Sequence, residues 1–475
     1  MLKKTSPMRV FRNSLLIFLL TAAGAHAEVP VVRQSALHKI EPDSYGLEIV
    51  RSNDFLNAGM WDKTAFGQAV SLIRAMKPVS LTATALQRGI LLATARPPAF
   101  TPKNEWLTVR MEKLFEWGLF DDVVQLGEKI PENLQTEKQR KIISDALLLT
   151  DFQRACAGRN GNPEQVRLLC EALNGNEDEV FRLSEIVGEQ GGDAYVLKAA
   201  DAFFSKTPFS ETPPAATAPN IAAARLAGVD FSSLIDDNAA LWVKKAYVET
   251  TSIPAEKRLP VAENLAQQGL LNPVELRTLY DETSFLTGDL EHDFAEAERR
   301  KAAAAFAAAT KDLWENQIAD ADILPDSLWR IKGFMAANLP EKAKSWVEKA
   351  ELTFPDSPTV VQGWAYAELQ PETERCFMPF LELMIRADVP AERIDAIMAV
   401  YTVMNLVPND EYWNLSTLTL PSLPERKGSA AEQVLKAIAG MTERPDGLLQ
   451  GLGSLQQMGF EREALRIAVE TEAVP

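Results

Sequence analysis

The sequence LAQQGL at residues 265–270 decides the fold, because it marks the end of one helix and the turn into the next. An apolar residue, three further residues, a glycine and a second apolar residue form the pattern of a Schellman-type helix stop. Glycine adopts the left-handed backbone conformation that ends such a helix, and the apolar residue after it folds back onto the last turn. A second, antiparallel helix is predicted over residues 273–280, so this stretch predicts a helical hairpin.

The same pattern occurs three more times, as LFEWGL at residues 114–119, FMAANL at 334–339 and LQQMGF at 455–460. It places helix-stop positions at four residues: Gly118, Gly269, Asn338 and Gly459. A second helix is predicted after each of the added stops, over residues 123–130, 341–352 and 462–470. Helical hairpins of this kind are the unit from which α-solenoids are stacked.

The spacing of the stops is irregular. Gly269 and Asn338 are 69 residues apart, about twice the roughly 34-residue period of a common helical repeat, but the other intervals do not fit that period. Chance recurrence of a common helix-stop signal is the alternative explanation. Strand signals are weak, since no stretch shows sustained alternation of apolar and polar residues. We therefore predict an all-α fold, an irregular tetratricopeptide-like α-solenoid of helical hairpins, in two or three segments.

The N-terminus has the features of an export signal. The apolar run LLIFLLTAAGA covers eleven residues, 15–25, and is shorter than the roughly 20 residues that cross a bilayer. Four positive residues precede this run, Lys3, Lys4, Arg9 and Arg12. Ala25 and Ala27 form a small-residue cleavage site, so cleavage near Ala27 is predicted. We expect a periplasmic protein with no stable membrane insertion after cleavage; a retained N-terminal anchor is the alternative.

Proline-rich and polar stretches indicate where the chain divides. The predicted segments are a signal peptide (1–27), an extended N-terminal arm (28–65), an N-terminal helical-repeat domain (66–204), a Pro/Thr/Ala linker (205–220), a central helical-repeat domain (221–406), a loop (407–428) and C-terminal helical hairpins (429–475). Within the central domain, the Ala, Glu, Lys and Arg content of residues 291–316 predicts one long helix.

Two of the three cysteines are close in sequence. Cys156 and Cys170 enclose a loop of 15 residues, and in an oxidising compartment such a pair is a disulfide candidate. Closing the loop would stabilise the fold by roughly 3 kcal/mol. The bridge would join a helix over residues 144–157 to a second helix over residues 163–173; two buried free thiols are the alternative. Cys376 is left over and is expected to be buried in a helix.

Charge and motif content exclude several classes of function. The formal net charge of −17 repels nucleic acid and anionic lipid head groups, so no nucleic-acid partner is expected. The sequence has no His-x-x-x-His pattern, no Gly-x-Ser-x-Gly and no phosphate-binding glycine loop. No catalytic residue, metal site or cofactor is therefore predicted. The acidic pairs Asp121-Asp122 and Asp236-Asp237 are interpreted as solvated loop and cap residues.

Several stretches resemble a family of uncharacterised exported α-helical proteins of bacteria, tetratricopeptide-like in character. They are LQRGILLATARPP at residues 86–98, residues 111–126, LLCEALNGNEDEV at 168–180 and RLPVAENLAQQGLLNPVELRTLY at 258–280. Proteins of this kind sometimes carry the label "antifreeze glycopeptide polyprotein", which reflects their Ala and Thr content. Here an Ala-Ala-Thr triplet occurs at residues 215–217 and 308–310, which does not support that activity.

These observations together predict a non-catalytic, exported helical-repeat protein that binds or scaffolds other proteins of the cell envelope. Its partners are expected to be one or more envelope proteins. The alternative is an enzyme or accessory factor that acts on cell-wall peptidoglycan, because glycan cleavage requires two suitably separated carboxyl groups and no longer motif.

Overall fold

The computed structural model describes residues 42–47, 55–157, 163–317, 328–354, 357–367, 369, 391–404, 422–423, 427–443 and 446–471. The predicted signal peptide with Ala25 and Ala27, most of the loop at 407–428, and Cys376 lie outside the described residues. Residues Glu41–Pro475 form one compact unit, to which all described helices belong. The described residues contain no β-strand, and one isolated parallel bridge links Ala65 and Ala99. The predicted all-α class is therefore confirmed.

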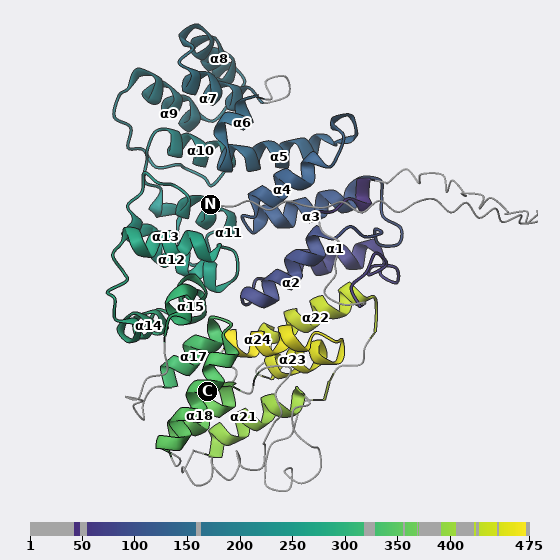
Figure 1. Cartoon of the computed structure of the whole chain (residues 1–475). Coiled ribbons are helices and arrows are strands. Elements are labelled where there is room, and N and C mark those ends of the chain that lie inside the picture. The colour runs from purple at the N-terminus through teal and green to yellow at the C-terminus, as the bar shows by residue number, and fades with distance from the viewer. Residues whose placement is uncertain are drawn as a thin grey trace, which may run out of the picture. The chain divides into compact units, whose positions relative to one another are not determined.

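The described α-helices follow one another along the chain (Figure 1). They are α1 Phe66–Ala75, α2 Leu81–Leu92, α3 Glu105–Glu116, α4 Phe120–Glu128, α5 Glu137–Thr150, α6 Phe152–Ala157, α7 Glu164–Asn174, α8 Glu177–Glu189, α9 Ala194–Ser205, α10 Ala218–Leu226, α11 Leu241–Val248, α12 Ala255–Gln267, α13 Pro273–Glu282, α14 Leu290–Arg299, α15 Ala303–Ala309, α16 Lys311–Glu315, α17 Leu328–Ala336, α18 Pro340–Thr353, α19 Pro358–Ala367, α21 Ala391–Val403, α22 Ala430–Glu443, α23 Gly447–Gln457 and α24 Glu461–Glu470. Short 3-10 helices lie at η1 Pro42–Ser44, η2 Glu132–Leu134 and η3 Ser232–Leu234.

Consecutive helices pack against each other, as in a solenoid of helical hairpins. The pairs α4 with α5, α7 with α8, α11 with α12, α17 with α18 and α23 with α24 are all in contact. Large aromatic side chains lie in the core between helices, and five tryptophans are fully buried: Trp61, Trp106, Trp117, Trp314 and Trp346. Burial of apolar area between neighbours, more than local propensity, stabilises helices of this length.

The four helix-stop positions all have the backbone geometry of a Schellman motif. The φ angles are 73° at Gly118, 74° at Gly269, 60° at Asn338 and 83° at Gly459. The residue after each stop donates its backbone N–H to the carbonyl oxygen five positions earlier, for example from Leu270 to Leu265 at 2.8 Å. These bonds satisfy carbonyl groups that the end of a helix leaves without partners.

Six further helix ends adopt the same geometry, and the sequence pattern did not single them out. Their left-handed residues are Gly175, Gly191, Lys206, Gly228, Ser284 and Lys301. At Lys301 the motif ends α14, because Ala302 donates its N–H to the carbonyl of Ala297 at 2.8 Å. The single helix predicted over residues 291–316 is therefore wrong, and the segment consists of α14, α15 and α16. Likewise, the helix predicted over 144–157 is interrupted at Asp151, which has non-helical φ and ψ of −131° and 85°.

A disulfide joins Cys156 in α6 to Cys170 in α7, with the two sulfur atoms 2.08 Å apart. This is the predicted pairing, and it staples the hairpin that these two helices form. The linker segment after α9 leads to α10, and these two helices pack against each other. The predicted domain boundaries stay predictions.

Helices from the two ends of the described chain pack together. α24 lies against α2, and α22 lies against both α1 and α2 (Figure 1). The carboxylate of Glu470 accepts hydrogen bonds from the backbone N–H and hydroxyl of Thr82, at 2.8 and 2.6 Å. The buried carboxylate of Glu432 accepts from the Thr64 hydroxyl at 3.1 Å and from the Gln68 amide. Among the described helices, none combines the length and apolar character needed to cross a bilayer.

Candidate functional site

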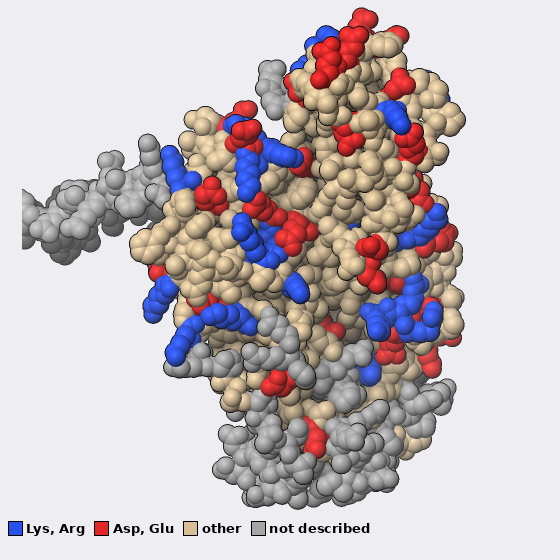
Figure 2. Space-filling view, turned by 180° about the vertical axis from the view of Figure 1, so that it is seen from behind, with Lys and Arg blue, Asp and Glu red and all other residues tan. Residues whose placement is uncertain are grey.

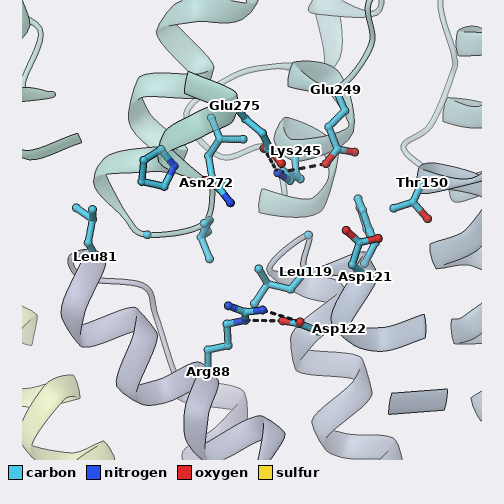
Figure 3. A pocket seen from close by; sticks show the side chains of 16 residues that line it. Leu81, Arg88, Leu119, Asp121, Asp122, Thr150, Lys245, Glu249, Asn272 and Glu275 are labelled. Atoms are coloured by element: carbon cyan, nitrogen blue, oxygen red, sulfur yellow. Dashed lines mark hydrogen bonds and ion pairs between the residues drawn. The ribbon is translucent and has the colours of Figure 1, made fainter. Parts of the chain in front are cut away.

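A hollow of about 350 Å³ opens to solvent where α2, α4, α11 and α13 approach one another (Figure 3). Its walls combine two helix-stop turns, the N-terminal turns of α4 and α13, and charged side chains from α2 and α11. The lining residues are Leu81, Arg88, Gly118, Leu119, Phe120, Asp121, Asp122, Thr150, Lys245, Glu249, Gly269, Leu270, Leu271, Asn272, Pro273 and Glu275.

Two of the predicted helix stops line the hollow, and both lie at close approaches between helices. A Cβ atom built on Gly269 would be 2.9 Å from Cα of Leu81, and one built on Gly118 would be 2.6 Å from Cβ of Lys245. Glycine at these positions therefore serves the turn and the packing together. Asn338 and Gly459 end α17 and α23 and do not line the hollow, and neither do Cys156 and Cys170.

Arg88 and Asp122 form an ion pair on one wall of the hollow. Nε of Arg88 lies 2.5 Å from Oδ2 of Asp122, and Nη2 lies 2.7 Å from Oδ1, so the contact is bidentate. Asp122 is in the first turn of α4, where the helix dipole favours a negative charge. Its side chain is 6 % exposed. The interpretation of Asp122 as a solvated residue is therefore wrong, because the Arg88 guanidinium replaces the water that a loop carboxylate would bind.

Lys245 lies between two carboxylates on the opposite wall. Its Nζ is 2.7 Å from Glu275 and 3.2 Å from Glu249, and its side chain is 9 % exposed. Burial favours the neutral amine, but the nearby charges of Glu249 and Glu275 outweigh this effect and raise the pKa of Lys245. Burial raises the pKa of Glu249, while the Lys245 ammonium opposes the shift and the negative charge of Glu275 adds to it.

The hollow carries more negative than positive charge. Four carboxylates line it, from Asp121, Asp122, Glu249 and Glu275, against the two cations of Arg88 and Lys245. Figure 3 shows Asp121, Glu249 and Thr150 on one side of the hollow. Asp121 is exposed, and no other described residue forms an ion pair with it. A positively charged group that enters the hollow would therefore meet a carboxylate that is not already paired.

The described residues hold no group of three or more His, Cys, Asp or Glu side chains placed to bind a metal ion. Asp236 and Asp237 are exposed in the segment before α11 and are not among the lining residues. Sequence reasoning missed Arg88, Lys245, Glu249 and Glu275, which occur on ordinary helices without a motif. Among the sequence signals, the helix stops at Gly118 and Gly269 mark residues that line the hollow.

Comparison with protein-family models, with curated proteins and with solved structures finds no match for this chain. The function is therefore proposed from the geometry and charge of the hollow.

Proposed function

We propose that this chain is an exported, periplasmic helical-repeat protein that binds another protein of the cell envelope. In this proposal the hollow holds a lysine or arginine side chain of the partner, and the chain itself is not a catalyst. The resemblance to exported helical proteins of bacteria, which we propose as its family, agrees with this assignment. The observation that carries the proposal is the solvent-open hollow in which four carboxylates face two cations.

The size and chemistry of the hollow suit a single long cationic side chain. Its volume of about 350 Å³ lies near the lower end of the range for ligand pockets, roughly 300–1,000 Å³. Asp121 offers an exposed carboxylate, and the half-buried Glu249, which also contacts Lys245, offers a second one. A guanidinium or ammonium placed between them would form charge-assisted hydrogen bonds and offset the negative charge of the hollow.

The proposal is tested by in-cell cross-linking and affinity capture of the tagged chain, read by mass spectrometry. Asp121→Asn is the informative variant, because it removes the exposed carboxylate and keeps the side-chain shape. Asp236→Asn is the matched control, since Asp236 is an exposed acid outside the hollow. We expect a reproducible envelope protein whose recovery falls about tenfold with Asp121→Asn, as the loss of one charged hydrogen bond implies.

Two results would refute the proposal. One is capture of nothing beyond the proteins recovered with an unrelated acidic exported protein. The other is equal recovery with Asp121→Asn and Asp236→Asn, which would show that the hollow takes no part in binding.

A second candidate function, action on cell-wall glycan, is favoured by one observation. The hollow combines Glu249, whose pKa burial raises, with the exposed carboxylate of Asp121, and glycan cleavage uses one protonated and one ionised carboxyl group. Digestion of purified peptidoglycan tests it. Soluble fragments released by the native chain but not by Glu249→Gln would establish this function, and release of none would remove it.

A further inference from the structure

The first two helices and the loop after them carry positive charge alone. Residues 63–104 contain six basic residues and no acidic residue, although the whole chain has 66 acids against 49 bases. The six are Lys63, Arg74, Lys77, Arg88, Arg96 and Lys103. In Figure 2 the left side of the molecule, the side of α1 and α2 in that view, carries both Lys or Arg and Asp or Glu side chains. The segment is therefore locally basic in a strongly acidic chain, although Arg88 pairs with Asp122 and Arg96 with Asp62.

An exposed aromatic residue stands in this basic segment. Phe100 is 93 % exposed and has a φ of 63°, a left-handed conformation that is unfavourable for a bulky residue. It lies in residues 93–104, which connect α2 to α3 and are called the Phe100 loop below. An exposed aromatic ring and a strained backbone both cost free energy, and no described residue covers the ring. Strain of this kind clusters at binding sites.

The Phe100 loop is held firmly by its backbone. The N–H of Ala99 donates to the carbonyl of Thr64 at 3.0 Å, and the N–H of Phe66 donates to the carbonyl of Ala99 at 2.9 Å. The Thr101 hydroxyl donates to the carbonyl of Pro98 at 2.7 Å. An aromatic side chain presented by such a fixed loop loses little conformational freedom when it binds.

Two lysines lie close to the Phe100 loop, one through a backbone hydrogen bond and one through sequence. The bond between Ala99 and Thr64 brings Lys63 beside the loop, and Lys103 follows Phe100 by three residues. Both lysines are exposed, and neither forms an ion pair with another described residue. Arg96 is also exposed, but it is paired with Asp62 at 2.5 Å. Among the described residues, no ion pair neutralises these two lysines beside the Phe100 loop.

We propose that the Phe100 loop is a docking element, and that Phe100 inserts into an apolar cleft with an acidic rim on another envelope protein. Rigid aromatic anchors surrounded by polar contacts are typical of protein interfaces. A membrane is the less suitable partner, because one ring and two unpaired lysines give little attraction and the net charge of −17 repels anionic lipid. The inference rests on the proposed protein-binding function, but it concerns Lys63, Phe100 and Lys103, none of which lines the hollow.

The test is photo-cross-linking in cells with the full chain. Benzoyl-phenylalanine replaces Phe100 in one strain and Phe181 in a control strain, because Phe181 is 62 % exposed on α8 and has ordinary helical geometry. We expect an adduct with one envelope protein from position 100 but not from position 181. The cross-linked peptide of the partner is expected to contain Asp or Glu beside apolar residues. Substitution of both lysines, Lys63→Glu and Lys103→Glu, is expected to lower the adduct yield about tenfold.

A charge exchange makes the test specific. Replacement of the cross-linked acid of the partner with lysine is expected to restore the yield in the doubly substituted strain. Equal adducts from positions 100 and 181, or a yield that the lysine substitutions do not change, would overturn the inference. An adduct with a second copy of this chain would also overturn it. The purified chain can also be sedimented with vesicles of phosphatidylglycerol and phosphatidylethanolamine. Co-sedimentation that Phe100→Ala abolishes would overturn the inference, because it would show that the loop binds lipid.

The inference and the proposed function fail separately. If a partner is captured in an Asp121-dependent manner and position 100 gives no adduct, the docking loop is refuted and the proposed function stands. If position 100 gives the expected adduct and Asp121→Asn has no effect, the docking loop is supported and the role of the hollow is refuted.

Discussion

Replacing each of two glycines with alanine separates the free-energy cost of backbone strain from the cost of close packing. Gly228 and Gly269 both end helices in Schellman geometry, with φ of 69° and 74°. A Cβ atom at Gly228 would meet no heavy atom within 4 Å, whereas one at Gly269 would lie 2.9 Å from Cα and 3.1 Å from the carbonyl oxygen of Leu81. Both variants place an L-residue in the left-handed region, and only one also forces α2 away.

The magnitudes follow from these two contributions. The left-handed conformation costs about 1–2 kcal/mol, partly offset by about 0.4–1 kcal/mol from the reduced freedom of the unfolded chain. We therefore expect Gly228→Ala to lower the free energy of unfolding by about 1 kcal/mol. At Gly269 the neighbouring atoms are backbone, so overpacking adds about 1–3 kcal/mol and the total loss is about 2–4 kcal/mol.

Urea unfolding followed by circular dichroism measures both variants, with the slope m compared to confirm that the same surface is exposed. Hydrogen exchange of the α2 amides provides a local measurement, since the displacement caused by Gly269→Ala is expected there. Equal losses for the two variants would refute the reasoning, because the close approach of Gly269 to α2 would then contribute nothing to stability.

Three further predictions follow from the fold and the hollow. Lys301→Gly is expected to raise the free energy of unfolding by roughly 0.5–1 kcal/mol, because it relieves a left-handed lysine with φ of 58°; a lower urea midpoint would contradict this. Replacement of Cys156 and Cys170 together by serine is expected to cost about 3 kcal/mol, and reductant should lower the thermal midpoint of the native chain but not of this variant. Because the pKa of Glu249 is raised in the folded state, this state binds the proton at a higher pH than the unfolded state does. The group therefore adds to the free energy of unfolding below the ordinary pKa of 4.5, and that contribution is lost as pH rises through the folded-state pKa. Glu249→Gln should therefore make unfolding less dependent on pH in that range, and an unchanged pH profile in urea titrations would refute the assignment.

The fold class could be predicted because its signals are local. A Schellman stop with glycine or asparagine is written in six consecutive residues, as at residues 265–270, and needs no knowledge of the rest of the chain. Helix ends at Lys206, Ser284 and Lys301 have the same geometry without glycine, so these stops occur where the local residue preference opposes them. The error over residues 291–316 has this origin, since high helix propensity concealed the stop at Lys301.

The hollow could not be predicted for a related reason. Its walls depend on the meeting of Leu81, Gly118, Lys245 and Gly269, and no local pattern connects these positions. From the sequence, Asp121 and Asp122 receive the same interpretation as solvated acids. In the structure Arg88 buries one member in an ion pair and leaves the other exposed. Charges on amphipathic helices acquire distinct roles only when their neighbours are known.

The packing of α24 and α22 on α1 and α2 constrains how this chain reaches its folded form. In an open solenoid each hairpin needs only its neighbour, so structure can spread from one end as the chain emerges. Here the side of α2 that faces α24 stays uncovered until residues near Glu470 have been made, so the closing step joins the most distant parts of the sequence.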